Sequence, residues 1–433
     1  MKQRVVVTGM GVVSPCGITL EEFETNLKAG RSGIRLIDRL AELKFTCQVG
    51  GVPPGVEARS RASFAEEDLL AMNSSMLYGC LAALDAWQSA GLERPEARGN
   101  EVDWDAGALI GTGIGGMDTI AERVVPLVNQ GKIRRLGSSC VEQIMGSSVA
   151  AKVGGLLALG NQVTSNSSAC TTGTEAIFLG FDRVRRGLAL RMLAGGSEGS
   201  SPYIWAAFDA MRVLARGYND RPERASRPMS QSATGFVPAS GAGVLLLESL
   251  EEANRRGVTP YAEILGGAVN CGGQRMGGSM TAPNPHGVQR CIRAALVDAG
   301  IEPSGIDAIS GHLTATMADP LEIHNWAEAL GRPADEMPLI TATKSLLGHG
   351  LGAAGGMESV AVCLMLCGGY VHGSRNCEDL HPSLLPYGGR IAQETVHTPA
   401  LRVMAKAGFG FGDVNGCLIF RKWEKQPPEE EIP

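Results

Sequence analysis

The sequence lacks several features that would place it in other protein classes. It has no CxxC pair and no Cys/His pair at metal-ligand spacing, so a zinc site is not expected. Its formal net charge is −6, which argues against nucleic acid as the main partner. No apolar run reaches about 18 residues, the length that suggests a membrane span, and the N-terminus has no signal-peptide pattern. These absences predict a cytoplasmic protein that neither crosses a membrane nor binds nucleic acid.

The composition is that of a folded globular protein with free thiols. Hydrophobic residues make up 44% of the 433 residues and charged residues 19%, which is enough apolar material for a large core. The eleven cysteines are an odd number in a chain with no secretory signal. We therefore expect most of them to be free thiols in a reducing compartment.

Strand-like and helix-like segments alternate along the whole chain, which predicts an α/β architecture. The predicted strands are short apolar runs at 4–13, 108–113, 162–164, 191–194, 243–248, 261–269, 306–310, 339–343, 401–406 and 416–420. The predicted helices span 66–90, 174–186, 288–299 and 353–367.

The pattern restarts near residue 255, so we divide the chain into halves 1–255 and 256–433. Each half contains a strand that leads into a glycine-rich elbow and a helix of small residues. In the first half this segment reads SSACTTGTEAI, and in the second it reads GHGLGAAGGMESV. The repetition suggests a duplicated fold.

Cys170 stands in the first of these elbows, between a polar run and an amphipathic helix. Taken alone, a cysteine there is either a buried, inert thiol or a nucleophile. A position at a helix N-terminus favours the second possibility, because unpaired N–H groups and the helix dipole lower a thiol pKa. The backbone N–H of Cys170 could also stabilise an oxyanion.

A nucleophilic cysteine usually needs a histidine, and the chain has only seven. Five of them are in segments where an exposed or hydrogen-bonded histidine is the simpler interpretation: His286, His324, His372, His381 and His397. The other two, His312 and His349, follow glycines in small-residue segments, where backbone and ligand can approach closely.

Four motifs in order, SSACTTG, HLTAT, TKSLLGHGLGAAG and GFGFGDVN, make the chain resemble the β-ketoacyl-acyl-carrier-protein synthases of the thiolase superfamily. The resemblance covers almost the whole chain. It implies a thiolase-like fold of two pseudo-duplicated halves in a five-layered αβαβα arrangement. It also implies a homodimer, with 162–166 and the following helix as the candidate interface, or a heterodimer with a paralogous ketosynthase.

The resemblance assigns roles to individual residues. The catalytic residues would be Cys170, His312, His349, Lys344 and Phe411. The residues binding the substrate or its pantetheine arm would be Phe236, Thr314, Thr316, Thr281, Ile114 and Phe409. Structural support would come from Glu358, Asp319 and Glu322.

The implied reaction is a decarboxylative condensation in fatty-acid or type II polyketide or polyene chain elongation. Cys170 would accept the acyl chain, and His312 and His349 would hold the malonyl thioester carbonyl. An acyl carrier protein would be the partner and would deliver the phosphopantetheine, so no cofactor and no metal are expected. The alternatives are a non-catalytic chain-length-factor-like subunit of a heterodimer and another acyl transferase of the superfamily.

The sequence departs from the family's motifs at several positions. Leu313 replaces a glycine, which predicts a bulky side chain beside the first histidine. Asp413 and Val414 replace a Gly-Thr pair, which predicts altered mobility of the loop that carries Phe411. Ser230 replaces an aspartate. We expect these changes to affect the substrate range more than the basic reaction.

Overall fold

The computed structural model describes residues 2–97 and 99–424, and in it ten strands form one continuous sheet. The first half contributes β1 (Val5–Val13), β4 (Ala106–Gly111), β5 (Val163–Thr164), β6 (Arg191–Glu198) and β7 (Gly241–Ser249). The second half contributes β8 (Ala262–Cys271), β9 (Ala308–Ser310), β10 (Leu339–Thr341), β13 (Val403–Gly410) and β14 (Val414–Lys422). All ten predicted strands are thereby confirmed, with ends that differ by a few residues.

The strand order reveals the duplication. The order is β10-β9-β13-β14-β8-β1-β7-β6-β4-β5, and the two halves meet where β1 pairs antiparallel with β8 over three residues. From that junction outward, the strands of the two halves pair in the same way: two antiparallel pairings are followed by two parallel pairings. The predicted two-fold repetition of the fold is therefore confirmed.

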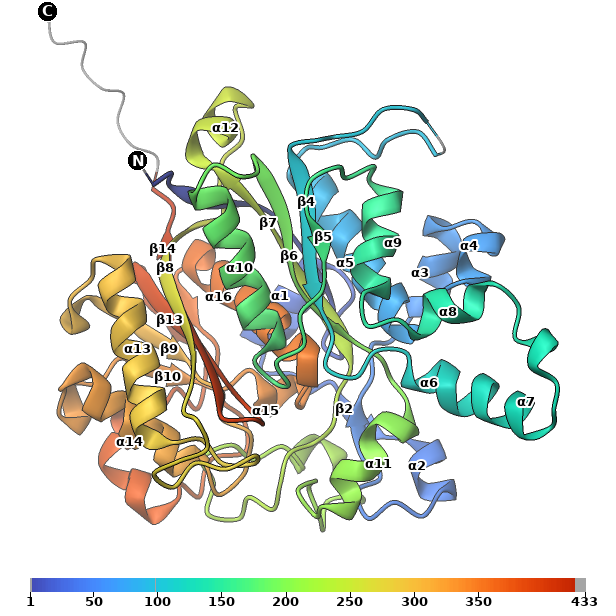
Figure 1. Ribbon diagram of the computed structural model, residues 1–433. Coiled ribbons are helices and arrows are strands. Elements are labelled where there is room, and N and C mark those ends of the chain that lie inside the picture. The colour runs from blue at the N-terminus through green and yellow to red at the C-terminus, as the bar shows by residue number, and fades with distance from the viewer. Residues whose placement is uncertain (1, 98, 425–433) are drawn as a thin grey trace, which may run out of the picture.

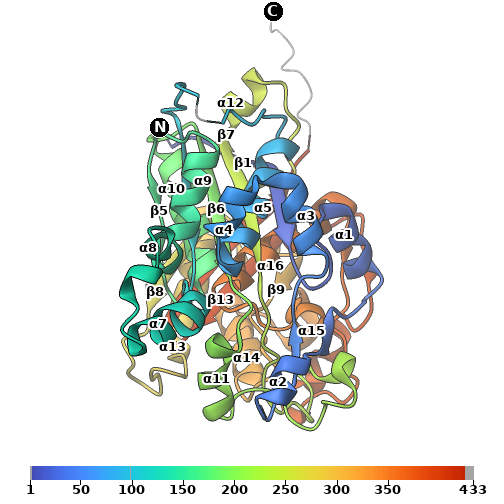
Figure 2. The ribbon, with the colours of Figure 1, turned by 90° about the vertical axis from the view of Figure 1, so that its right-hand side faces the viewer.

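Helices cover both faces of each half of the sheet, and this arrangement has five layers (Figures 1 and 2). In the middle, α10 (Thr172–Arg185) and α16 (Ala354–Gly368) lie between the two halves of the sheet. The outer layer of the first half contains α5 (Ser74–Ser89) and α9 (Ser148–Leu156), and that of the second half contains α13 (Pro285–Ala299) and α14 (Asp319–Leu330). The αβαβα expectation is confirmed.

The smaller elements connect and cap this frame. Two small antiparallel sheets have two strands each: β2 (Ile34–Leu36) with β3 (Val49–Gly51), and β11 (Tyr370–Val371) with β12 (Val396–His397). The remaining α-helices are α1 (Leu20–Lys28), α2 (Asp38–Glu42), α3 (Val56–Ser63), α4 (Glu66–Leu70), α6 (Met117–Thr119), α7 (Val125–Asn129), α8 (Ser139–Ile144), α11 (Pro202–Ala210), α12 (Leu250–Arg255) and α15 (Lys344–Leu347).

Two expectations about helices were wrong. The single helix predicted over 66–90 is two: α4 ends at Leu70, and the Asn73 side chain caps the start of α5 by accepting from the Met76 N–H. The second error is the expectation that no apolar run reaches about 18 residues. The helical run Leu351–Gly368 is long and apolar enough to cross a membrane, but 89% of it is buried inside the protein. Its place between the two halves of the sheet identifies it as a core helix.

Candidate active site

Cys170 is positioned by a strained turn between β5 and α10. The preceding residue, Ala169, has a left-handed backbone with φ +49°, which costs about 1 kcal/mol for a residue with a side chain. Two hydrogen bonds of Thr172 hold this turn: its hydroxyl donates to the Ala169 carbonyl at 2.7 Å and accepts from the Ser168 N–H at 2.8 Å. The turn lifts the thiol to the start of α10, as the sequence predicted.

Glycines let the two central helices meet behind this turn. A Cβ on Gly173 in α10 would lie 2.6 Å from the Gly356 nitrogen in α16. A Cβ on Gly356 would in turn lie 2.1 Å from the Gly243 carbonyl oxygen on β7. The small residues of both elbow motifs therefore bring the nucleophile segment against the segment that follows His349.

His349 contacts the nucleophile directly. Its Nε2 lies 3.0 Å from the Cys170 Sγ, and its Nδ1 accepts a hydrogen bond from the Leu351 N–H at 3.2 Å. Because Nδ1 is an acceptor, the ring proton of the neutral imidazole sits on Nε2. His349 thus presents an N–H donor to the sulfur and to the space beside it.

His312 presents a second donor beside His349. The two imidazole rings lie edge to face with centroids 5.3 Å apart. The His312 Nδ1 lies 3.4 Å from Lys344 Nζ, and an ammonium has no acceptor, so this nitrogen accepts. Lys344 is also paired with Glu358 on α16. The ring proton of His312 is therefore on Nε2, as in His349.

Both histidines are neutral under ordinary conditions. Burial and the nearby Lys344 charge hold the pKa of His312 and of His349 well below the usual 6.5. Neutral imidazoles donate one N–H each without adding positive charge, which suits a partner oxygen that becomes negative only during a reaction.

The expected low pKa of the Cys170 thiol is not what the structure gives. Burial raises the pKa of Cys170 to about 11, although the Lys344 charge and the backbone N–H of Phe411 act to lower it. The apolar surroundings outweigh the helix N-terminus because they disfavour the thiolate. The resting thiol is therefore neutral.

This pKa predicts the pH dependence of Cys170 alkylation. Below pH 9 the rate with iodoacetamide should rise about tenfold per pH unit, because only the thiolate reacts. Peptide mass spectrometry would follow Cys170 separately from the exposed Cys271, which reports the reagent's own behaviour. A rate that levels off between pH 7 and 8 would contradict the raised pKa.

Two buried carboxylates of the second half hold the loop after His312. Glu322 accepts from the backbone N–H groups of His312 at 2.6 Å and Leu313 at 2.8 Å. Asp319 accepts from the N–H groups of Thr314 at 2.8 Å and of Ala315 at 3.0 Å. Both carboxylates therefore fix the backbone of the loop that carries the first histidine.

The side chain of Leu313 does not enter the pocket. It is 1% exposed and belongs to the core beneath α13 and α14. Leu313 therefore packs into this core, whereas the neighbouring His312 ring lies against His349. The expectation of a bulky group beside the first histidine is thus corrected.

Aromatic rings close the site around the histidines. Phe236 lies edge to face against His349 at 5.1 Å between centroids, and Phe409 lies 6.3 Å from His312. Phe208 of α11 bridges Phe236 at 5.6 Å and Phe411 at 6.3 Å. These rings keep the space beside the sulfur apolar.

The remaining predicted residues occupy three different places. Thr314 and Thr316 join their hydroxyls at 2.9 Å in the loop after His312. Ile114 packs against the apolar cluster that contains Phe236. Thr281 is exposed in the 272–284 loop, and among the described residues no hydrogen bond joins it to the other site residues. The structure brings the other predicted residues together but leaves Thr281 outside the group.

Asp413 fastens the loop that carries Phe411. It is fully buried with φ +63°, and its carboxylate accepts from the N–H groups of Gln274 and Asn284, each at 2.8 Å. The Gly412 N–H also donates to the Met280 carbonyl at 2.8 Å. The acidic residue therefore ties the Phe411 loop to the 272–284 loop.

Replacing Asp413 with glycine should loosen this connection. The loss of two charge-assisted hydrogen bonds costs about 3–6 kcal/mol of unfolding free energy, and relief of the left-handed backbone returns about 1 kcal/mol. We expect a lower Tm and faster amide hydrogen exchange at Gln274 and Asn284. Lys44→Gly, at an exposed residue with φ +60°, serves as the control for backbone relief alone. Unchanged exchange at both amides would contradict this account of the loop.

Two buried charged residues at the site were missed by the sequence analysis. Glu198, at the end of β6, accepts from the backbone N–H groups of Gly113 at 2.9 Å and Gly352 at 3.0 Å. Lys406, inside β13, pairs with Glu358 at 2.9 Å. Lys406 could have been found from the sequence, because a charged residue within a predicted buried strand is unusual. For Glu198 the partners are far away in sequence, and no local signal identifies them.

The Cys170 Sγ and one ring nitrogen each of His312 and His349 lie within 4.8 Å of one another. Among the described residues they form the one group whose donor atoms and spacing would suit a metal ion. The same three atoms are the ones that thioester chemistry would use, so we assign no separate metal centre.

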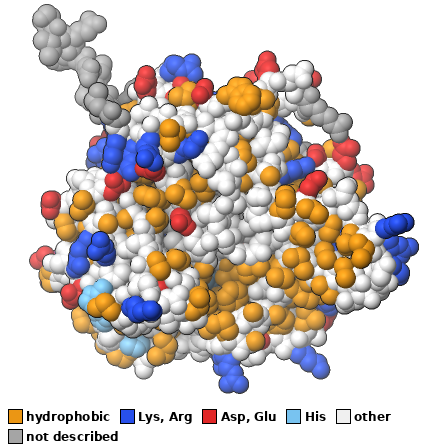
Figure 3. All heavy atoms as spheres, viewed as in Figure 1, with side chains coloured by type: hydrophobic (Ala, Val, Ile, Leu, Met, Phe, Trp, Pro, Cys, Tyr) orange, Lys and Arg blue, Asp and Glu red, His pale blue; other side chains and the backbone are white. Residues whose placement is uncertain are grey.

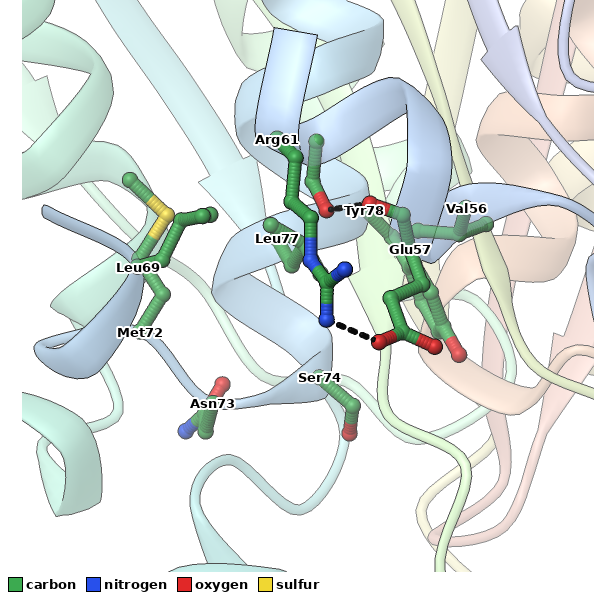
Figure 4. A pocket seen from close by; sticks show the side chains of 10 residues that line it. Val56, Glu57, Arg61, Leu69, Met72, Asn73, Ser74, Leu77 and Tyr78 are labelled. Atoms are coloured by element: carbon green, nitrogen blue, oxygen red, sulfur yellow. Dashed lines mark hydrogen bonds and ion pairs between the residues drawn. The ribbon is translucent and has the colours of Figure 1, made fainter. Parts of the chain in front are cut away.

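A separate surface pocket lies between α3 and α5 (Figure 4). Arg61 and Glu57, one turn apart on α3, line it and form an ion pair at 2.6 Å. None of its lining residues belongs to the Cys170 group, so we do not assign it to the reaction.

Comparisons with known proteins agree with this geometry. Residues 2–253 match the family described as beta-ketoacyl synthase, N-terminal domain, and residues 261–378 match the beta-ketoacyl synthase, C-terminal domain. The chain is 35% identical to 3-oxoacyl-[acyl-carrier-protein] synthase I, chloroplastic, of Arabidopsis thaliana, covering 97% of this chain and 86% of the relative. It is 33% identical to 3-oxoacyl-[acyl-carrier-protein] synthase 2 of Vibrio cholerae, covering 97% and 99%.

Solved structures show the same similarity. A beta-ketoacyl synthase from Burkholderia phymatum superimposes with a TM-score of 0.89 at 28% identity, covering 98% of this chain and all of that one. A type II polyketide ketosynthase, solved in complex with its acyl-carrier protein, superimposes with a TM-score of 0.85, also at 28% identity, over 98% of this chain. The chain therefore belongs to the β-ketoacyl synthase family of acyltransferases.

Proposed function

We propose that this protein is a β-ketoacyl-acyl-carrier-protein synthase that extends an acyl chain by two carbons. One observation supports this most strongly: a cysteine sulfur and two neutral imidazole N–H donors converge on one apolar space. A thioester exchange needs the sulfur, and a decarboxylation that leaves an enolate needs the donors.

In the first half-reaction, the Cys170 Sγ attacks the carbonyl carbon of an acyl-carrier-protein thioester. The new bond joins that carbon to the cysteine sulfur, and the bond to the pantetheine sulfur breaks. The thiol proton is transferred to the departing pantetheine sulfur. The N–H groups of Cys170 and Phe411 are assigned to the oxyanion, since the Phe411 N–H already faces the sulfur.

In the second half-reaction, the malonyl thioester oxygen accepts the Nε2–H bonds of His312 and His349. The bond between the α-carbon and the carboxylate breaks, CO₂ leaves, and the electron pair forms an enolate that the two donors stabilise. The α-carbon then attacks the acyl-cysteine carbonyl, and the cysteine thiolate departs. Phe236, which lies edge to face against His349, provides an apolar wall that favours release of neutral CO₂.

The supporting residues are assigned from their contacts. Lys344 and Glu358 fix the Nδ1 side of His312, while Asp319 and Glu322 fix its loop. We assign Thr314 and Thr316 to the pantetheine arm. Ile114 and Phe409 are assigned to the walls of the acyl pocket, and Thr281 to its outer rim in the 272–284 loop.

An acyl carrier protein is the proposed partner. Arg212 and Arg216 flank a segment that pairs with Phe236, since the Ala215 N–H donates to the Phe236 carbonyl at 2.9 Å. Together with Arg221 they place positive charge near the site. An acidic carrier protein would be attracted there, and the effect should weaken with salt.

We also propose a dimer, with a second copy or a paralogous ketosynthase as the other subunit. β5 is the edge strand of the sheet, and edge strands readily pair with a neighbour. Hydrophobic side chains gather on the same face over α6, α7 and α8 (Figure 3), among them Val125, Val128 and Val141. We propose in addition that 1–255 and 256–433 act as two halves of one cytoplasmic enzyme.

Mass spectrometry of carrier-bound products tests the proposal. Incubation with acyl-carrier proteins of several chain lengths and malonyl-carrier protein should yield 3-oxoacyl products two carbons longer. It would also show which acyl chain is preferred. A protein that makes no product and releases no CO₂ from malonyl-carrier protein would overturn the proposal and favour a non-catalytic partner subunit.

A further inference from the structure

Lys406 is a fully buried lysine that the roles above leave unexplained. It lies in the middle of β13 with no exposed surface. Its ammonium lies 2.9 Å from a Glu358 oxygen, 2.9 Å from the Thr174 hydroxyl and 2.5 Å from the Ala407 carbonyl oxygen. The ammonium donates hydrogen bonds to Thr174 and Ala407, and its contact with Glu358 is an ion pair.

These contacts connect the two halves of the active site. Thr174 is in the first turn of α10, directly after the Cys170 elbow. Glu358 is on α16, and its other oxygen pairs with Lys344, which contacts His312. One ammonium therefore links the helix behind the nucleophile to the carboxylate behind the first histidine.

We propose that Lys406 is a positioning residue for the condensation: a built-in cation that holds the second oxygen of Glu358 and the first turn of α10 in place. This inference rests on the proposed function. Without Lys406, Glu358 could rotate away from Lys344. The distance between the Cys170 sulfur and the His312 imidazole would then no longer be fixed. A misplacement of about 1 Å can lower a rate by about 10²-fold.

The charges around Lys406 support this role. Two lysines share one carboxylate, so the group carries one excess positive charge beside the site. The ionisable groups that face Lys406 are Glu358, Lys344, Glu322, Cys417, His312 and His349. After burial and Lys344, the Lys406 charge also acts to keep the pKa of His312 and His349 low.

The experiment compares Lys406→Met, Lys406→Ala and Met404→Ala. Met404 is buried on the same face of β13, so Met404→Ala creates a cavity without removing a charge. We expect kcat of Lys406→Met to fall roughly 10- to 100-fold with KM for malonyl-carrier protein unchanged. Met404→Ala should keep kcat within about threefold, since it leaves every hydrogen bond of the site in place.

Chemical rescue provides a second readout. In Lys406→Ala the vacated space is lined by the three oxygens and faces Ser310, the register partner of Lys406, whose buried hydroxyl has no hydrogen-bond partner. Methylammonium should bind there and recover kcat in Lys406→Ala but not in Lys406→Met. Histidine NMR titrations should also show His312 and His349 gaining protons at higher pH in Lys406→Met than in the wild type.

The outcomes separate this inference from the proposed function. A wild-type protein that does not condense would overturn the function, whereas unchanged histidine titration in Lys406→Met would overturn the role of Lys406. Wild-type kcat in folded Lys406→Met would also overturn it. If neither Lys406 variant folds, Thr174→Val should lower kcat and Thr174→Ser should restore it, and equal kcat in these two variants would overturn the inference.

Discussion

Cys170→Ala should abolish condensation while leaving the decarboxylation of malonyl-carrier protein measurable. Condensation should fall by at least about 10⁴-fold, because the acyl chain then has no covalent acceptor. The donors that hold the malonyl thioester belong to His312 and His349, which this substitution leaves in place. Product mass spectrometry and CO₂ release from the same reaction would measure the two steps separately.

The control for this variant is Cys367→Ala, at an exposed thiol at the end of α16. It should keep both activities. If Cys170→Ala still forms 3-oxoacyl product, Cys170 is not the acceptor. If it loses CO₂ release to the same extent as condensation, the two steps do not divide between sulfur and imidazoles as we propose.

His312→Ala should produce the opposite separation. Only His349 contacts the sulfur at hydrogen-bond distance, so the acyl-enzyme should still form without His312. The enolate would lose one of two donors, which lowers decarboxylation and condensation by about 10²- to 10³-fold. Intact-protein mass spectrometry would detect acylated Cys170, and CO₂ release would report the second step.

His324→Ala is the matched control, since that ring packs on Tyr387 at 5.7 Å, outside the group around Cys170. It should leave both steps unchanged. His349→Ala should impair acylation as well as decarboxylation, because its Nε2 faces the sulfur. Equal loss of acylation in His312→Ala and His349→Ala would contradict the separate roles of the two histidines.

The strands could be predicted because most of them are buried on both faces and therefore appear in the sequence as continuous apolar runs. β1 is one such run, from Val5 to Val13, with every residue buried. The break between α4 and α5 could not be predicted in this way. It depends on the Asn73 side chain, which accepts from a backbone N–H and competes with continuation of the helix.

The motifs located the nucleophile elbow and both histidines, but they did not predict the pKa of Cys170 or the packing of Leu313. The pKa of Cys170 depends on how deeply the sulfur is buried and on Lys344 and Phe411, which lie far from it in the sequence. Leu313 packs among core residues of α13 and α14, and its N–H donates to Glu322 of α14. Such effects arise from contacts between residues far apart in the chain, which local patterns do not encode.

The five-layer arrangement also affects how the chain can fold. The central core joins Phe181 of α10 and Leu245 of β7 with Val360 of α16 and Phe420 of β14, so both halves supply its side chains. Neither half alone can cover the inner face of its own sheet, although each has the full strand pattern. The duplicated halves are therefore not autonomous folding units. The central layer, and with it the juxtaposition of sulfur and imidazoles, forms only when the two halves fold together.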